Sequence, residues 1–98
     1  MRDATLLLTA LADPTRLAAL RLLRDEGERC VCQLVSALSA TQSRMSRHMA
    51  TLRQAGLVVD RRDAQWVRYR INPAMPAPVR RLVDAALDLT ETAERIAA

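Results

Sequence analysis

Residues 30–55, CVCQLVSALSATQSRMSRHMATLRQA, hold two cysteines, a short apolar segment, a three-residue break and a longer segment rich in Ser and Arg. The break at residues 39–41 ends with Thr41, whose hydroxyl can cap a following helix, and Gly56 lies where that helix would end. The pattern predicts two helices joined by a short turn, over about residues 32–55. This arrangement is a helix-turn-helix.

The second of these helices has two contrasting faces. At 3.6 residues per turn, Met45, Met49 and Leu52 lie together on one side. The other side and its shoulder carry small, polar or basic residues, namely Gln42, Ser43, Ser46, Arg47, Ala50 and Gln54. Small side chains let a helix backbone approach base edges, while Arg and Gln can hydrogen-bond to those edges. The division therefore predicts a DNA-recognition helix.

A β-hairpin is predicted directly after this helix, over about residues 57–71. Its second half alternates in a period of two, which indicates a half-buried strand, in the order Trp66, Val67, Arg68, Tyr69, Arg70 and Ile71. Paired with residues 58–61 through a turn near 62–65, it gives a hairpin with a basic tip and outer face. Tyr69 falls on the inward face, where packing is favoured over base stacking, and Trp66 stays open between the two. A helix-turn-helix followed by such a hairpin is a winged helix.

Positive charge is concentrated in the same region. Residues 41–71 carry seven arginines against two aspartates, a net +5, whereas the rest of the chain has a net charge of −1. Phosphate binding needs this concentration of positive charge on one region. The charge therefore argues against a winged helix that serves only protein interaction and does not read DNA.

The whole chain, residues 1–98, is predicted to be one domain, mainly α with a small β-hairpin. A short helix is expected at about 4–12. Asp13-Pro14 then supplies an N-cap and a first-turn proline for the next helix, which stops at Gly27. A last helix is expected at 79–97, after three prolines.

The last predicted helix carries a long apolar stripe, made of Val79, Leu82, Val83, Ala86, Leu89, Thr90 and Ala93. A domain of 98 residues buries a modest fraction of its surface, so a shared core would stabilise it. We expect residues 79–97 to pack with residues 4–12 against a second copy, giving a homodimer. The alternative is that the stripe folds back onto the core of its own chain.

Other classes of protein fit the sequence poorly. One histidine, two glycines and no pairing of a nucleophile with a base argue against an enzyme. No apolar run has membrane-spanning length, and the start MRDATLLLTALADP lacks the layout of a signal peptide. The chain is therefore expected in the cytoplasm, with no membrane partner.

Together these segments resemble the ArsR/SmtB family of bacterial metal-responsive winged-helix repressors. The matching stretches run in the family's order over nearly the whole chain: LADPTRLAALRLL, ERCVCQL, TQSRMSRHMATLRQAGLV and DRRDAQWVRYRI. The resemblance implies a homodimer that represses transcription on a palindromic double-stranded operator. It also implies that an inducing ion releases the protein from DNA.

Carried over position by position, the resemblance gives a set of DNA-binding residues. On the recognition helix they are Gln42, Ser43, Ser46 and Arg47, with His48 adjoining, and on the wing Arg61, Arg62 and Arg68. For His48, a phosphate contact or an intramolecular hydrogen bond is favoured over metal ligation. The hairpin tip departs from the family, since Asp63-Ala64 stands where Asp-Gly is frequent, and this leaves the turn type open.

Cys30 and Cys32 resemble the family's site for trivalent arsenic and antimony, which favour soft thiolate ligands. Residues i and i+2 of a regular helix point roughly 200° apart, so binding one ion there requires the helix to unwind or fray. Such a distortion would misplace the recognition helix. Val35 stands where the family's third thiol usually lies. The third ligand would then be water, a small thiol, a donor from the partner subunit, or the carbon substituent of an organoarsenical.

Several alternatives for the cysteines stay open. Both can be small buried hydrophobes, or they can sense oxidation or another thiophilic metal. For oxidation, intersubunit pairing or sulfenic acid is expected over a strained bridge between i and i+2. The family's cadmium and lead sites need N-terminal cysteines that this chain lacks. Its zinc and cobalt sites need a histidine after Asp84, which is also missing.

Overall fold

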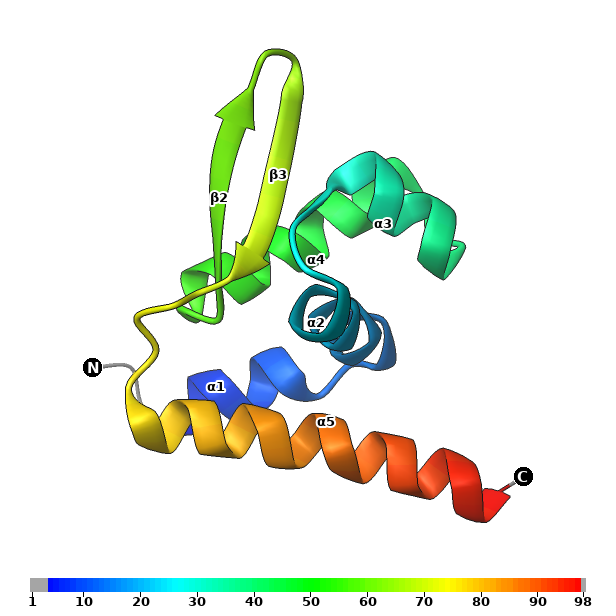
Figure 1. The fold of residues 1–98 in the computed structure, drawn as a ribbon, viewed down its shortest axis with the longest axis vertical. Coiled ribbons are helices and arrows are strands. Elements are labelled where there is room, and N and C mark those ends of the chain that lie inside the picture. The colour runs from blue at the N-terminus through cyan, green and yellow to red at the C-terminus, as the bar shows by residue number, and fades with distance from the viewer. Residues whose placement is uncertain (1–3, 98) are drawn as a thin grey trace.

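The computed structural model describes residues 4–97, with side chains described as far as Leu89, and it is mainly helical (Figure 1). The described helices are α1 (Ala4–Leu11), α2 (Pro14–Glu26), α3 (Val31–Leu38), α4 (Gln42–Gln54) and α5 (Ala77–Ala97). The strands are β1 (Arg29–Cys30), β2 (Val58–Asp63) and β3 (Trp66–Ile71), which form an antiparallel sheet in the order β1-β3-β2. The β2–β3 hairpin projects from the helices as the wing, so the predicted winged helix-turn-helix is confirmed.

The predicted start and end of α2 are confirmed. Asp13 is extended, with φ −154° and ψ 128°, and its carboxylate accepts a hydrogen bond from the Arg16 backbone N–H at 2.9 Å. Pro14 occupies the first turn, where its missing N–H has no partner to lose. Gly27 ends the helix with φ 91°, a value that a side chain would disfavour.

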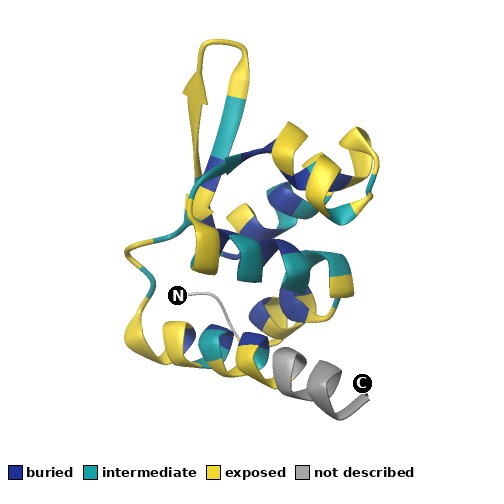
Figure 2. Ribbon diagram, turned by 45° about the vertical axis from the view of Figure 1, so that its right-hand side comes forward, coloured by how far each residue is buried: buried dark blue, intermediate teal, exposed yellow. Residues whose placement is uncertain are grey.

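One apolar core lies between the helices and the base of the wing (Figure 2). Its largest side chains, all with less than 2% of their surface exposed, are Leu20, Leu34, Met45, Met49, Leu52, Leu57, Val58, Val83 and Leu87. Burial of a leucine or methionine side chain stabilises a fold by about 1.5–3 kcal/mol. The predicted apolar face of α4, formed by Met45, Met49 and Leu52, is fully buried. This face anchors α4 and leaves its polar side toward solvent.

The sheet has a strand that the sequence pattern did not predict. Strand β1 is two residues long, and it pairs Arg29 with Tyr69 and Cys30 with Arg68. Strand β2 is also two residues longer than expected, since Asp63 pairs with Trp66 across a two-residue turn, whereas β3 has its predicted bounds. A two-residue strand is too short to show a period of two, which explains why it was missed.

The wing turn places an alanine in a left-handed conformation. Ala64 has φ 55°, which favours glycine. Replacing it, Ala64→Gly, should remove roughly 1 kcal/mol of backbone strain, partly offset by the greater freedom of glycine in the unfolded chain. We expect a higher urea midpoint for unfolding. Ala85→Gly, on the exposed side of α5, is the control and should lower stability by about 1 kcal/mol. A lower midpoint for Ala64→Gly would contradict the expected relief of strain.

Helix α5 begins at Ala77, two residues before the predicted start. Pro78 falls within the first turn of α5, where a backbone N–H is not needed. The proline is therefore part of the helix, whereas the prediction placed it before the helix. The Arg80 N–H donates to the Pro76 carbonyl at 3.0 Å, which marks this first turn.

The apolar stripe of α5 divides between two roles. Val79, Val83 and Leu87 are buried in the core of the same chain, and α5 passes beside α1 and α2 (Figures 1 and 2). The expectation that the whole stripe faces a second copy is therefore corrected, because its first half covers the chain's own core. Leu89 is 69% exposed. Thr90 and Ala93 lie outside the residues whose side chains are described.

Candidate nucleic-acid interface and thiol site

The start of α4 is well defined. Thr41 is extended, and its hydroxyl accepts a hydrogen bond from the Arg44 N–H at 3.2 Å, as predicted for the cap. Four of the predicted DNA-binding side chains are exposed along this helix, namely Gln42, Ser43, Ser46 and Arg47. Because the opposite face is anchored in the core, these side chains are presented on a rigid helix. Their contact with DNA stays a prediction.

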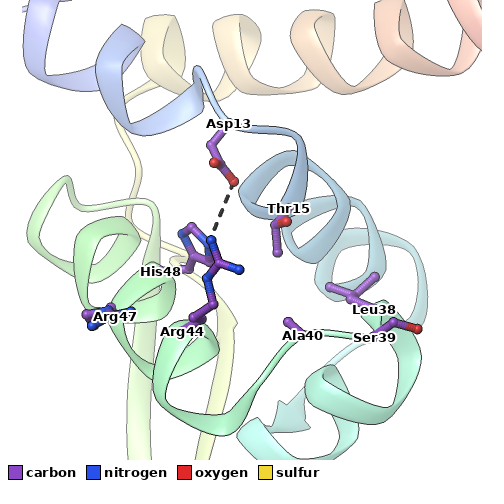
Figure 3. Close-up of a pocket in the computed structure, with 8 residues that line it drawn as sticks. All are labelled: Asp13, Thr15, Leu38, Ser39, Ala40, Arg44, Arg47 and His48. Carbon is purple, nitrogen blue, oxygen red and sulfur yellow. Dashed lines mark ion pairs between the residues drawn. The ribbon is translucent and has the colours of Figure 1, made fainter.

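His48 differs from those four residues, since it is half-buried against the corner between α1 and α2. Its Nδ1 lies 3.1 Å from Nη1 of Arg16. On the other side of the ring, its Nε2 lies 3.9 Å from Oδ2 of Asp13, the contact that is dashed in Figure 3. An arginine can only donate, so whenever the His48 ring is neutral its Nδ1 accepts from Arg16 and its Nε2–H faces the Asp13 carboxylate. Of the two contacts favoured for His48, a phosphate contact or an intramolecular hydrogen bond, the structure contains the hydrogen bond. A DNA contact by this residue stays a prediction.

Arg16 is a connecting residue that sequence reasoning missed. Besides His48, its guanidinium donates to the carbonyls of Ala10 at 2.6 Å and Thr9 at 3.0 Å, at the end of α1. A cation is favourable at this end of a helix, where carbonyls lack partners. Arg16 therefore links α1, α2 and α4. The sequence holds no signal for it, because two of its acceptors are backbone carbonyls and the third, His48, is distant in the sequence.

Asp13 should make stability depend on acid pH. Burial by itself would raise the pKa of Asp13, but the Arg16 N–H and the nearby His48 and Arg16 charges outweigh burial and lower it below 3.8. A lowered pKa contributes stability that is present above the unfolded pKa and is lost as pH falls through the folded value.

We predict that Asp13→Asn, which keeps a good N-cap, removes this pH-dependent part of the stability. Asp13→Ala should lose in addition about 1 kcal/mol from the cap at neutral pH. Urea unfolding at several pH values between neutral and acid checks both variants. Parallel stability–pH curves for wild type and Asp13→Asn would show that the charge has no such effect.

The wing arginines differ in their partners. Arg61 makes a two-pronged ion pair with Glu28, with Nε–Oε2 at 2.9 Å and Nη2–Oε1 at 2.8 Å, and Arg68 pairs with Asp63 at 2.9 Å. The hydrogen bonds from Arg61 lower the pKa of Glu28. Arg62 is exposed, and no carboxylate of the described residues pairs with it. Exposed ion pairs contribute little to stability, so exchange of these carboxylates for DNA phosphates would cost little.

Cys30 and Cys32 form a disulfide within the chain. Cys30 is buried and extended, with φ −79° and ψ 163°, so it precedes α3, while Cys32 lies exposed in the first turn. The Gln33 side chain accepts a hydrogen bond from the Cys30 N–H at 2.9 Å and holds this junction.

This geometry corrects two expectations. The two sulfurs meet without unwinding of α3, because only Cys32 is inside the helix. Intrachain pairing also replaces the predicted preference for intersubunit pairing or sulfenic acid, since the extended conformation at Cys30 turns its side chain toward Cys32.

A cleft of about 260 Å³ opens beside the cysteine pair, where the starts of α3 and α4 meet the wing. Its lining residues are Cys30, Val31, Cys32, Gln42, Ser46, Gln65, Trp66, Val67 and Tyr69. Tyr69 is 6% exposed, and burial raises its pKa, so its predicted packing role is confirmed. Trp66 is 42% exposed on the cleft wall. Sequence reasoning missed this cleft because three separate segments build it.

A second cleft, of about 350 Å³, lies on another side of α4 (Figure 3). Its lining includes Arg44, Arg47 and His48 from α4 together with Asp13 and Thr15 from the start of α2. Arg47 therefore stands between the open face of α4 and this basic cleft.

Other metal-binding arrangements were also considered on the described residues. Asp84, the candidate of the zinc and cobalt type, pairs with Arg80 at 3.1 Å and with Arg24 at 3.5 Å. Within the described part of the chain, no three His, Cys, Asp or Glu side chains gather into a metal site. Val35 packs against the core and supplies no ligand. None of the helices searched in residues 4–97 is long and apolar enough to span a membrane.

Comparison with known proteins gives consistent results. A family model for "Bacterial regulatory protein, arsR family" matches residues 13–59. The chain is 47% identical over 76 residues to the "Arsenical resistance operon repressor" of Escherichia coli K12, covering 78% of this chain and 65% of that protein. It is 45% identical over 97 residues to the "Arsenic resistance transcriptional regulator ArsR1" of Pseudomonas putida KT2440, covering 87% of this chain and 76% of that protein.

A solved structure adds the comparison of folds. The homodimeric winged helix-turn-helix DNA-binding domain of a Mycobacterium bovis protein superposes with a TM-score of 0.73 at 30% identity, covering 89% of this chain and 77% of that one. The fold, the motif order and the relatives agree. The chain belongs to the ArsR family of bacterial regulatory proteins, whose members are DNA-binding transcriptional regulators and not enzymes.

Proposed function

We propose that this protein represses an operon of the arsenic-resistance type and leaves its operator when trivalent arsenic or antimony binds Cys30 and Cys32. The observation that carries the proposal is the meeting of the two sulfurs at the junction of β1 and α3. Two convergent thiolates chelate a soft ion well. The relatives named for arsenical resistance support the same class of inducer. We expect no permanent cofactor.

The proposed DNA contacts come from α4 and the wing. Gln42, Ser43, Ser46 and Arg47 would read bases of a palindromic double-stranded operator, with His48 at the edge of that face. Arg61, Arg62 and Arg68 would contact phosphates or the minor groove. The exposed side of α4 and the net charge of +5 on residues 41–71 support this assignment.

The active form is proposed to be a homodimer in the cytoplasm. Three exposed leucines support a second copy packing on the terminal helices: Leu6 and Leu8 on α1, at 45% and 51% exposure, and Leu89 on α5. The homodimeric state of the M. bovis domain supports the same arrangement. Two recognition helices related by a twofold axis would match a palindromic operator.

Two routes connect the thiol site to the DNA-binding surface. Cys30 is paired with Arg68 in the sheet, so a movement at Cys30 is transmitted to β3 of the wing. Helix α3, which begins just after Cys30, packs directly on α4. Arsenic binding would therefore shift the wing and the recognition helix together. Water, a small thiol or a donor from the partner subunit would complete the coordination.

The proposal is tested with the reduced protein on a labelled operator that the protein itself has selected from random DNA. Fluorescence anisotropy should fall on addition of arsenite or antimonite, and the binding should weaken steeply with salt. Cadmium is the comparison ion. An operator complex that persists at arsenite levels saturating the thiols would contradict the proposal, and binding independent of DNA sequence would favour a different role.

Thiol oxidation is a second candidate signal, favoured by the disulfide itself. Closing the bridge removes two thiols and fixes Cys30 against Cys32, beside β3. In this case a mild thiol oxidant would change operator affinity, and a cellular thiol would reverse the change by disulfide exchange. Oxidised and reduced protein that bind the operator equally would exclude this switch. The disulfide also means that arsenic binding must follow reduction of the bridge.

A further inference from the structure

Trivalent arsenic forms three bonds, and this chain offers two thiols for them. An arsenic atom held by Cys30 and Cys32 therefore carries a third substituent that is not a cysteine of this chain. The space beside both cysteines is the cleft of about 260 Å³ between α3, α4 and the wing. The size of this cleft and the polarity of its lining determine which third substituent on arsenic fits there.

Apolar and aromatic side chains form much of this cleft. The sequence contains one Trp, one Tyr and no Phe, and both of these aromatic residues, Trp66 and Tyr69, line the cleft. Val31 and Val67 add aliphatic surface. Both Trp and Tyr of the chain thus lie beside its two thiols. A hydroxyl group on arsenic would gain little from contact with these aromatic side chains, whereas an apolar substituent would be stabilised by it.

The cleft has room for an aromatic ring. An apolar cavity of about 150 Å³ holds benzene, so about 260 Å³ accommodates a phenyl group with its arsenic atom at the rim. Trp66 is 42% exposed, so part of its surface is open for a bound group to cover. Aromatic pairs favour offset or edge-to-face contact, which adds to the gain from burial alone.

We propose that the thiol site prefers aryl-substituted trivalent arsenicals, with arsenic on Cys30 and Cys32 and the aryl group in the cleft against Trp66. This inference rests on the proposed arsenic response and names the class of inducer. A cellular thiol first reduces the disulfide, giving two cysteine thiols and one oxidised thiol pair. An arylarsonous acid, R–As(OH)₂, then exchanges two As–O bonds for two As–S bonds and releases two waters. Arsenic stays trivalent throughout.

Occupation of the cleft would act directly on the DNA-binding surface. Gln42 and Ser46, two of the residues proposed to read bases, line the same cleft from the start of α4. An aryl group there lies between the recognition helix and the wing. Induction then combines movement of Cys30 with occupation of space at the operator interface.

The test uses the full chain, reduced by a phosphine that is removed before the measurement. Arsenite and phenylarsonous acid compete for the protein, and intact-mass spectrometry gives the ratio of the two adducts for wild type, Trp66→Ala and Trp66→Phe. Because free dithiols have their own preference between these compounds, the readout is the change in this ratio between variants. We expect Trp66→Ala to lower the preference for the phenyl compound about fivefold to tenfold, and Trp66→Phe to retain most of it.

Fluorescence of the single tryptophan gives a second readout on the wild type. Phenylarsonous acid should change Trp66 emission more than arsenite at equal occupancy. An unchanged adduct ratio in Trp66→Ala, with arsenite still bound and still releasing the operator, would overturn this inference alone. Absence of any arsenic adduct at the two cysteines would overturn the proposed function and the inference with it.

Discussion

Serine in place of Cys30 or Cys32 is expected to keep the protein on its operator at arsenite concentrations that release the wild type. A hydroxyl is a hard, neutral ligand, so each variant retains one soft ligand and loses chelation. Linking two ligands on one chain raises affinity by about 100-fold or more over single attachment. A shift of at least this size in the arsenite midpoint, read from anisotropy of labelled operator, is the expected result.

Two further measurements separate sensing from folding in this experiment. Both serine variants should bind the operator like reduced wild type when arsenite is absent, because serine is close in size to cysteine. Cys32 is exposed, and Cys30, which is buried, occupies the N-cap of α3, a position that serine suits. Val35→Cys, one helical turn after Cys32, should shift the midpoint the other way by supplying a third thiol. If both serine variants respond to arsenite like wild type, the two cysteines are not the sensor.

Alanine in place of Arg47 is expected to remove much of the preference for the operator over other DNA. A good two-pronged contact between arginine and guanine is worth about 1–3 kcal/mol, roughly 5- to 150-fold in affinity, and the proposed homodimer would lose it in both half-sites. Arg62→Ala should instead weaken binding to all sequences alike and reduce the salt slope by about one per subunit. Titrations of operator and scrambled DNA at several salt concentrations measure both effects.

Arg81→Ala is the matched control for these two variants. Arg81 is exposed on α5, outside the basic residues 41–71, so its removal changes the net charge equally without touching α4 or the wing. Its operator affinity should stay close to wild type. Equal loss of specificity in Arg47→Ala and Arg62→Ala would undo the division between base reading and phosphate contact.

The helix-turn-helix and the wing could be predicted because their signals are local. The cap at Thr41, the buried spacing of Met45, Met49 and Leu52, and the alternation along β3 each depend on a few neighbouring residues. Local patterns of this kind survive folding when tertiary packing agrees with them. The apolar side of α5 could also be predicted. The surface on which it packs could not, since the same apolar stripe suits the core of its own chain or a second copy.

Features that depend on contacts between distant segments could not be predicted. Arg16 reaches carbonyls of α1 and the His48 ring of α4, and Glu28, next to β1, meets Arg61 on β2 at the opposite edge of the sheet. At Cys30 the assumption of helical geometry failed because the pairing of β1 with β3 holds this residue extended. The cleft beside the thiols joins α3, α4 and the wing, and no single segment signals it.

The pairing of β1 with β3 determines the smallest fragment of this regulator that keeps the surroundings of its cysteines intact. The region matched by the family model ends at residue 59, before β3 begins at Trp66. A fragment cut there keeps both cysteines and α4 but strips Cys30 of its strand partner, Arg68, and the cleft of its aromatic wall. A graft of the proposed thiol switch onto another DNA-binding domain should therefore carry β1, α3 and the complete hairpin together.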